Sequence, residues 1–499
     1  MNYICLLNHQ TIALKEIPVL NYSSFFETIT TLMVGQPARH CVSYFGFQEK
    51  NSIRLICCIA DDDSHQILVS SCLVSQNDKL PAITCVLLGF EKFEREIHEN
   101  FGIDFPDHPW LKPVRYAFNR YDKSKTIHNY PFFKMKGEEL HEVAVGPIHA
   151  GVIEPGHFRF ICNGEQILHL EIQLGYQHRG LEQLFLKKQD PLYLAILSEN
   201  IAGDTAVGHA TAFSMLYESI CHIHVGDNIH FSRTLALELE RIAIHTGDLS
   251  AICADIGYQL GNAVYGRLRT PIVNFMQEWA GNRLSKGFVR PGQNPFPFTE
   301  TLRQRLLVIL EIFEKDFVEM SDEFFKLPSV LSRLERTGAV ISSEMLEIGA
   351  VGMAARAAGI NRDIRKSHPF GTYSSLNHSP LISHSADVLA RVWLRRAEVT
   401  QSISYIRNML NAIPDRPAES ITLQLPKPEL FAISLVEGWR GEICHCAITD
   451  NMGRLTHYKI KDPSFHNWLA LALAVRNNEI SDFPVCNKSF NLSYSGHDL

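Results

Sequence analysis

The hydrophobic pattern of this chain changes near residue 120, and this change constrains the fold more than any other feature. Before it, short β-rich apolar runs alternate with polar turns, which predicts strands at residues 54–60, 66–74 and 83–90. After residue 180, apolar side chains recur at helical spacing over long stretches, at residues 235–249, 302–324 and 387–410. The two patterns require two structurally different regions.

We therefore predict an α+β N-terminal domain over residues 1–120, a linker over residues 121–140, and a larger, mainly α-helical domain over residues 141–499 with a small antiparallel β-sheet. In the first domain, Phe93, Ile97 and Phe101 recur every four residues and indicate a short amphipathic helix.

Composition excludes several classes of protein. The chain has 499 residues, of which 45% are hydrophobic and 20% charged, as in ordinary globular proteins, and its net charge of −7 gives no basic bias for binding nucleic acid. No uncharged apolar run is long enough to span a membrane, and the N-terminal residues do not resemble a secretion signal. The 12 cysteines form no Cys-x-x-Cys pair, which favours reduced thiols in the core.

Four stretches place Gly beside His, Arg or Glu. They are residues 146–159, 175–182, 437–445 and 490–499. Glycine permits close backbone approach, so the charged groups can converge on a buried cofactor. The alternative is a set of tight turns with charges at the surface.

These stretches, in this order, resemble the large subunit of energy-converting nickel–iron hydrogenases and the related quinone-site subunit of respiratory complex I. Gly175-Tyr-Gln-His-Arg-Gly-Leu-Glu182 is similar to the shared Gly-x-x-His-Arg-Gly-x-Glu motif, and Glu437-Gly-Trp-Arg-Gly441 to Glu-x-Pro-Arg-Gly. Residues 91–102 with His108-Pro109 resemble the small peripheral-arm subunit of complex I, which is fused to the large one in several of these hydrogenases. Further shared blocks lie at residues 282–292, 356–370 and 462–467.

The resemblance implies a subunit of a membrane-attached, redox-driven, ion-translocating complex. Its expected partners are an iron–sulfur small subunit and membrane antiporter-like subunits, and its expected place is peripheral, on the cytoplasmic face of the inner membrane. The sequence carries no Gly-x-Gly-x-x-Gly or Walker motif, so any NADH site would lie on a partner.

The departures from the family concern the metal. Hydrogenases of this type hold nickel with four thiolates from two Cys-x-x-Cys pairs, and the corresponding positions here are Ala202, Thr205, Ser493 and Gly496. Ala and Gly offer no donor, and neutral hydroxyls bind soft metals poorly. We expect no nickel–iron centre and no cofactor held by this chain alone. The iron–sulfur cluster would lie on the partner, and a quinone or another small acceptor would enter the old cavity.

The resemblance also supplies candidate site residues. The candidate catalytic residues are Glu154, His157, Asp204, His209 and Arg440. The candidate cofactor-binding residues are His149, His178, Arg179, Glu182 and Gly203, the last at the position after the first missing cysteine, where complex I has a quinone-contacting Tyr. We predict no metal ligand.

Each of these residues also has a structural interpretation. Glu154 relays protons or pairs with Arg159. Arg440 holds an anion or a quinone carbonyl, or pairs with Glu437 or Glu442.

The remaining candidates are interpreted in the same way. Arg179 and Glu182 are expected to form an ion pair facing the iron–sulfur subunit. Asp204, Glu154 and His209 together could form a hydrated proton path.

Cys444-His445-Cys446 suggests a metal site, but on a strand the two thiols share one face and His445 takes the other, which favours packing. Two further functions stay open beside the redox one. The first is a non-catalytic structural and proton-coupling subunit of such a complex. The second is a working hydrogenase with unusual metal ligands.

Overall fold

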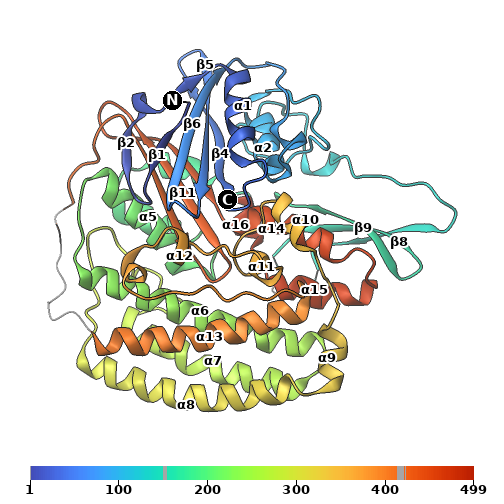
Figure 1. Cartoon of the computed structure of the whole chain (residues 1–499), viewed down its shortest axis with the longest axis vertical. Coiled ribbons are helices and arrows are strands. Elements are labelled where there is room, and N and C mark those ends of the chain that lie inside the picture. Colours follow the sequence, from blue (N-terminus) through green and yellow to red (C-terminus); the bar gives the residue numbers. More distant parts are fainter. Residues whose placement is uncertain (1, 150–153, 413–420, 422) are drawn as a thin grey trace.

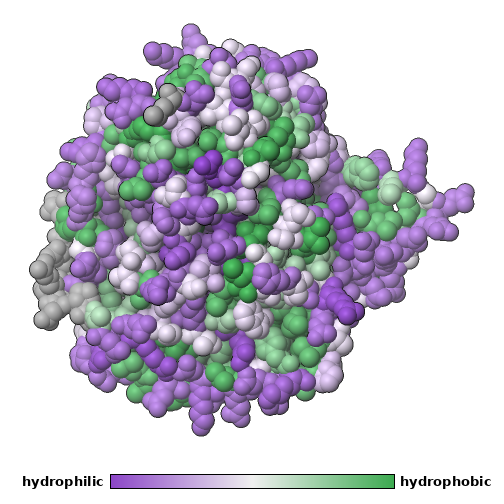
Figure 2. All heavy atoms as spheres, viewed as in Figure 1, coloured by the Kyte–Doolittle hydropathy of each residue, from purple (hydrophilic) through white to green (hydrophobic). Residues whose placement is uncertain are grey.

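The computed structural model describes residues 2–499 except 150–153, 413–420 and 422. Figure 1 shows the N-terminal strands at one end of the molecule, the long helices at the other, and a sheet from the C-terminal third between them. On the face drawn in Figure 2, apolar residues form separate patches among polar ones. Within the described ranges, no helix is long and apolar enough to cross a membrane.

A five-stranded sheet forms the core of the N-terminal region. Its strands, in spatial order, are β1 (Ile4–Leu6), β6 (Gln66–Val74), β5 (Ser52–Asp61) and β4 (Arg39–Glu49), with β3 (Val19–Leu20) parallel to β6. Neighbouring side chains of β5 point to opposite faces, and both faces are buried. Leu55 packs with the helices α1 (Tyr22–Met33) and α2 (Glu91–Phe101), whereas Ile56 packs with the core of the rest of the chain. The sheet is therefore covered on one side by its own helices and on the other by the larger region.

The strand predicted at residues 83–90 is wrong. This segment forms two 3-10 turns, η2 (Ile83–Cys85) and η3 (Leu88–Phe90). The buried carboxylate of Glu94 accepts the backbone N–H groups of Ile83 (2.7 Å) and Thr84 (3.1 Å). Because a side chain uses these donors, they are not available to a strand ladder.

The larger region contains two antiparallel sheets. One consists of β12 (Leu455–Lys461), β11 (Glu442–Thr449), β10 (Leu430–Glu437) and β2 (Thr11–Ala13), in that order. β2 comes from the N-terminal end of the chain and pairs with β10, Ile12 opposite Phe431. The other consists of β7 (Leu140–Val145), β8 (His157–Asn163) and β9 (Gln166–Gln173) and projects from the side of the molecule (Figure 1).

Helices make up most of the larger region, as predicted. The 29-residue α6 (Asp227–Asp255) packs between α7 (Gln259–Ala280) and α13 (Val388–Asn411), and α8 (Glu300–Phe324) forms the outer layer (Figure 1). The apolar face of α8 is buried and its opposite face is exposed, as its helical spacing predicts. The shorter helices are α3 (Leu181–Lys187), α4 (Pro191–Ser198), α5 (Ala206–Ile220), α9 (Pro328–Leu334), α10 (Ser342–Glu347), α11 (Gly352–Ala357), α12 (Ile364–Ser367), α14 (Ser464–Ala474), α15 (Phe483–Phe490) and α16 (Tyr494–Asp498). The predicted fold class is confirmed.

Candidate functional site

A cavity of about 400 Å³ lies where three of the four glycine-containing stretches (residues 146–159, 437–445 and 490–499) meet the loop before α5. Its described lining contains two carboxylates, two cations and several hydroxyl and amide groups. The lining residues are Glu154, Gly203, Asp204, Arg440, Asn487, Lys488, Asn491, Leu492, Ser493, Tyr494 and Ser495. None of these described residues is a cysteine.

Arg440 is the most constrained group of the cavity. Its Nη2 lies 2.6 Å from Oδ2 of Asp204, and its Nη1 donates to Asp204 Oδ1 and to Thr205 Oγ1, both at 3.0 Å. Its Nε donates to the carbonyl oxygen of Asn491 at 2.5 Å, and its guanidinium lies 4.0 Å over the ring of Trp439. The guanidinium thus joins the segment before α5 to the C-terminal segment.

The two pairings that we considered for Arg440 are both wrong. Glu437 bonds to Arg356 at 2.8 Å, and Glu442 contacts Lys461 and His40. The backbone turn after β10 sends Arg440 to the other side, where Asp204 is its partner.

Glu154 lies across the cavity and is half-buried. Its Oε2 accepts the backbone N–H of Ser495 at 3.2 Å. Arg159, the alternative partner, pairs instead with Glu142 at 2.7 Å because both are on neighbouring strands. Among the residues that the structure describes, Glu154 thus has no cation within ion-pair distance.

His209 lies on α5 behind the cavity wall and is fully buried. Its Nε2 lies 3.0 Å from Oδ2 of Asp462, and its Nδ1 lies 3.1 Å from Nε2 of His445. Nδ1 of His445 lies 2.8 Å from the hydroxyl of Tyr458. Burial holds the pKa of His445 well below its usual value, so this ring is neutral and the four groups form one continuous hydrogen-bonded chain.

Sequence reasoning placed His209 with Asp204 and Glu154, but the structure separates it from them. Its partners Asp462 and His445 are distant in the sequence, and only the fold reveals them. Asp462 lies two residues before α14, in one of the blocks that carried the resemblance, and that was the only available signal.

The side chain of Asp462 also fills the space beside Gly496, the position of the last missing cysteine. A Cβ placed on Gly496 would lie 2.7 Å from Cγ of Asp462. Ser493 also has a different role from a ligand, because its Oγ accepts the N–H of Gly496 at 2.8 Å and caps α16.

Two of the candidate histidines lie beside the cavity and do not line it. Nε2 of His149 lies 3.2 Å from the carbonyl oxygen of Gly156, and its ring is 6.4 Å from that of Tyr494, a cavity residue. His157 begins β8, where its Nδ1 lies 3.2 Å from the carbonyl oxygen of Gly146 and its ring packs on Phe132.

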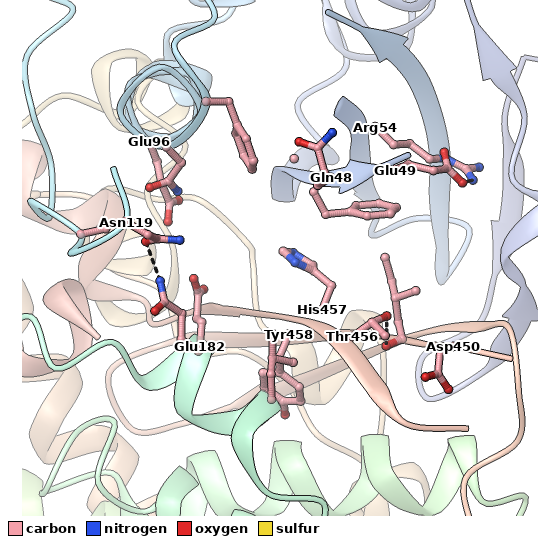
Figure 3. Close-up of a pocket in the computed structure, with 18 of the residues that line it drawn as sticks. Gln48, Glu49, Arg54, Glu96, Asn119, Glu182, Asp450, Thr456, His457 and Tyr458 are labelled. Carbon is pink, nitrogen blue, oxygen red and sulfur yellow. Dashed lines mark hydrogen bonds and ion pairs between the residues drawn. The ribbon is translucent and has the colours of Figure 1, made fainter. Parts of the chain in front are cut away.

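His178 and Glu182 line a different and larger space, a groove of about 930 Å³ between the N-terminal sheet, α2, α3 and β12 (Figure 3). The predicted ion pair of Arg179 with Glu182 is wrong. Glu182 pairs with Lys459 at 3.1 Å and accepts the N–H of Ile460. Arg179 donates to backbone carbonyls, among them that of Ser495 at 3.0 Å, and so supports the cavity segment from behind.

The prediction for Cys444-His445-Cys446 is confirmed. The two sulfur atoms lie 3.8 Å apart on one face of β11, and His445 takes the other face. Within the described part of the chain, no group of three or more His, Cys, Asp or Glu side chains is arranged to hold a metal ion.

Comparison with known proteins identifies related families for both parts of the chain. Residues 20–131 match the family described as respiratory-chain NADH dehydrogenase, 30 Kd subunit, and residues 255–431 match its 49 Kd subunit. The chain is a homologue of hydrogenase and NADH-quinone oxidoreductase subunits.

Several relatives span most of the chain. Hydrogenase-4 component G of Escherichia coli is 25% identical over 449 residues, which is 87% of this chain and 78% of that protein. The C/D fusion protein of the NADH-quinone oxidoreductase of Phocaeicola vulgatus is 24% identical over 77% of this chain and 80% of its own length. The alpha component of the membrane-bound hydrogenase of Pyrococcus furiosus is 25% identical over 70% of this chain and 85% of its own length. The relatives to which this homologue of hydrogenase and complex I subunits is similar are thus components of multi-subunit complexes.

Proposed function

We propose that this chain is the large subunit of a membrane-attached, redox-driven, ion-translocating complex, and that its cavity takes a quinone or another small electron acceptor in place of a nickel–iron centre. The observation that carries the proposal is the Asp204–Arg440 ion pair, which lies beside Thr205, where the resemblance places a nickel thiolate. In this proposal the chain is a peripheral subunit on the cytoplasmic face of the inner membrane, beside an iron–sulfur subunit and antiporter-like subunits.

The chemistry of the lining supports a neutral polar ligand over a metal. A nickel site needs soft anionic donors, whereas the described lining offers hydroxyls, amides, two hard carboxylates and two cations, each cation paired with a carboxylate. The guanidinium of Arg440 presents N–H groups that can donate to a carbonyl oxygen. Asp204 is about one-third exposed, so the pair faces the cavity.

Reduction of a quinone takes two electrons and two protons and yields a quinol. The electrons would come singly from the iron–sulfur cluster of the partner. Arg440 would stabilise the negative charge that develops on the quinone oxygen, and Glu154, which pairs with no cation among the described residues, would deliver one proton to it. The second proton would come from solvent.

The test uses the purified complex. We expect it to reduce a short-chain quinone with an artificial electron donor, to contain no stoichiometric nickel by elemental analysis, and to lose at least 10-fold in turnover in Arg440→Gln and in Glu154→Gln. The matched control is Arg267→Gln, which breaks an exposed ion pair with Asp316 on the outer helices. Stoichiometric nickel, or turnover that neither variant changes, would contradict the proposal.

A second function, structural and proton coupling without redox chemistry, is favoured by the buried charges behind the cavity. Asp248 pairs with Arg395 at 3.0 Å and accepts from Asn491, the residue that also binds Arg440. Farther in, Arg356 lies between Glu398 (2.6 Å) and Glu437 (2.8 Å). An assembled complex that transports ions but never reduces a quinone, and whose transport is lost in Arg440→Gln, would show this function instead.

A further inference from the structure

A second cavity, of about 520 Å³, lies between the N-terminal region and the larger region. α2, the segment after it, β9 and α14 surround it. Most of its wall is apolar, and four aromatic side chains dominate it: Trp110, Tyr130, Phe133 and Trp468. A volume of this size with a mostly apolar wall and a few polar groups is typical of sites for small organic ligands.

The charged groups of this cavity are not balanced. Its lining contains four cations, Lys92, Arg95, Lys112 and Arg476, against two carboxylates, Glu91 and Glu171.

Two of the four cations each form an ion pair with one of the two carboxylates. Arg95 forms an ion pair with Glu91, and Lys112 forms one with Glu171. Glu91 also accepts the indole N–H of Trp110 at 2.6 Å, and Glu171 accepts the backbone N–H of Phe133 at 2.6 Å, so both carboxylates are satisfied by protein groups.

The other two cations, Lys92 and Arg476, have no carboxylate within ion-pair distance in the part of the chain that the structure describes. Nζ of Lys92 donates to the carbonyl oxygen of Phe465 at 2.6 Å and lies 5.8 Å from the centre of its ring. Burial lowers the pKa of Lys92 to about 7, and the negative charge of neighbouring Glu91 offsets this only in part.

We propose that this cavity binds a small organic anion with an apolar, aromatic-sized body and a single carboxylate, whose head group pairs with Lys92. The aromatic wall would remove the body from water, and the anionic head would supply the counter-ion that the protein itself does not provide. Arg476, at the rim and exposed, would favour entry of the same charge.

The proposed preference for an anionic head group can be tested with three probes that share a naphthalene ring and differ in the head group. They are naphthalene-2-carboxylate, its neutral carboxamide and 2-naphthylmethylamine. Trp110 and Trp468 both line the cavity, so quenching of tryptophan fluorescence reports binding to the intact complex, and calorimetry gives the stoichiometry. We expect one carboxylate per chain, bound at least 10-fold more tightly than the carboxamide, and weakest binding for the amine.

Two variants locate the site. Lys92→Met should abolish the preference for carboxylate over carboxamide and leave carboxamide binding unchanged, whereas Lys92→Arg should keep the preference. Ala472→Phe, from the α14 wall, should fill the cavity and block all three probes. Lys188→Met, remote from this cavity, is the matched control, and thermal unfolding checks that each variant is folded.

The proposal is overturned if the carboxylate binds no more tightly than the carboxamide, if Lys92→Met leaves the preference intact, or if no probe binds at all. Because the readout is binding and not turnover, these outcomes are independent of whether the first cavity reduces a quinone.

Discussion

Arg440 and Asp204 are joined at two points, Nη2 to Oδ2 at 2.6 Å and Nη1 to Oδ1 at 3.0 Å, although 236 residues separate them in the sequence. This pair closes one wall of the candidate cavity. It connects the turn after β10 with the loop before α5, and it sets the position of the guanidinium on which the proposed chemistry depends.

Asp204→Asn should therefore destabilise the protein and misplace Arg440. Removing one partner of a fully buried pair costs about 3–5 kcal/mol, but Asp204 is one-third exposed, so we expect about 1–2 kcal/mol. Urea unfolding of the purified chain measures this, and a double-mutant cycle with Arg440→Gln isolates the pair. A coupling energy near zero would show that the pair contributes nothing.

Stability should fall as pH rises from 6 to 8 because of Glu240. Its carboxyl group is buried under α5, where it accepts the N–H groups of Val207 and Gly208, and burial together with the charge of Asp204 raises its pKa to about 8. A carboxyl whose pKa is raised on folding binds its proton in the native state at pH 6 but not in the unfolded chain, and this advantage is lost as pH approaches 8.

For this shift the expected loss between pH 6 and pH 8 is about 2 kcal/mol. Glu240→Gln should reduce the pH dependence of stability by that amount, while the exposed Glu311→Gln should leave it unchanged. Denaturation at the two pH values compares the three proteins, and parallel pH profiles for Glu240→Gln and wild type would rule out this role.

Gly496→Ala should cost about 1–3 kcal/mol, because the new Cβ would lie 2.7 Å from Cγ of Asp462 and displace the carboxylate from His209. Gly203→Ala is the matched control, since a Cβ there meets nothing within 4 Å. Thermal unfolding of both variants checks the prediction. Equal melting temperatures would mean that the Asp462 side chain moves aside without cost.

Lys459→Met should weaken the junction between the N-terminal region and the larger one. Lys459 on β12 reaches Glu96 on α2 at 2.6 Å and Glu182 on α3 at 3.1 Å, and it is almost fully buried. Its loss removes the cation of the partly exposed Glu182, whereas Glu96 keeps its ion pair with Arg115, and we expect about 1–3 kcal/mol of destabilisation. Limited proteolysis should cleave the segment between the two regions faster in Lys459→Met than in wild type, whereas Lys15→Met, which changes an exposed residue, should behave as wild type.

Local sequence patterns predicted the elements that depend on local periodicity. The spacing of Phe93, Ile97 and Phe101 predicted α2, and the apolar runs predicted β5 and β6, because in each case one face or both faces of the element are buried. The prediction of a strand at residues 83–90 failed because Glu94, a residue of the following helix, accepts two of the backbone N–H groups of this segment.

The site was predictable only in part. The resemblance singled out Glu154, Gly203, Asp204 and Arg440, and all four line one cavity. It could not supply the partners, since Arg440 had two nearer acidic residues in sequence and pairs with neither. For the same reason the contact of His209 with Asp462 was not predicted. These residues are 253 positions apart, and they meet because α5 packs against the sheet of β10, β11 and β12, which residue spacing in the sequence does not reveal.

The pairing of β2 with β10 has a consequence for how this polypeptide could be divided. Thr11–Ala13 completes a sheet whose other strands begin more than 400 residues later, so a cut anywhere in residues 121–140 leaves each fragment with an unfinished ladder edge. Two co-expressed halves should thus recognise each other through exposed backbone as well as through side chains. The covalent link between the two parts makes permanent an association that the pairing of β2 with β10 already specifies.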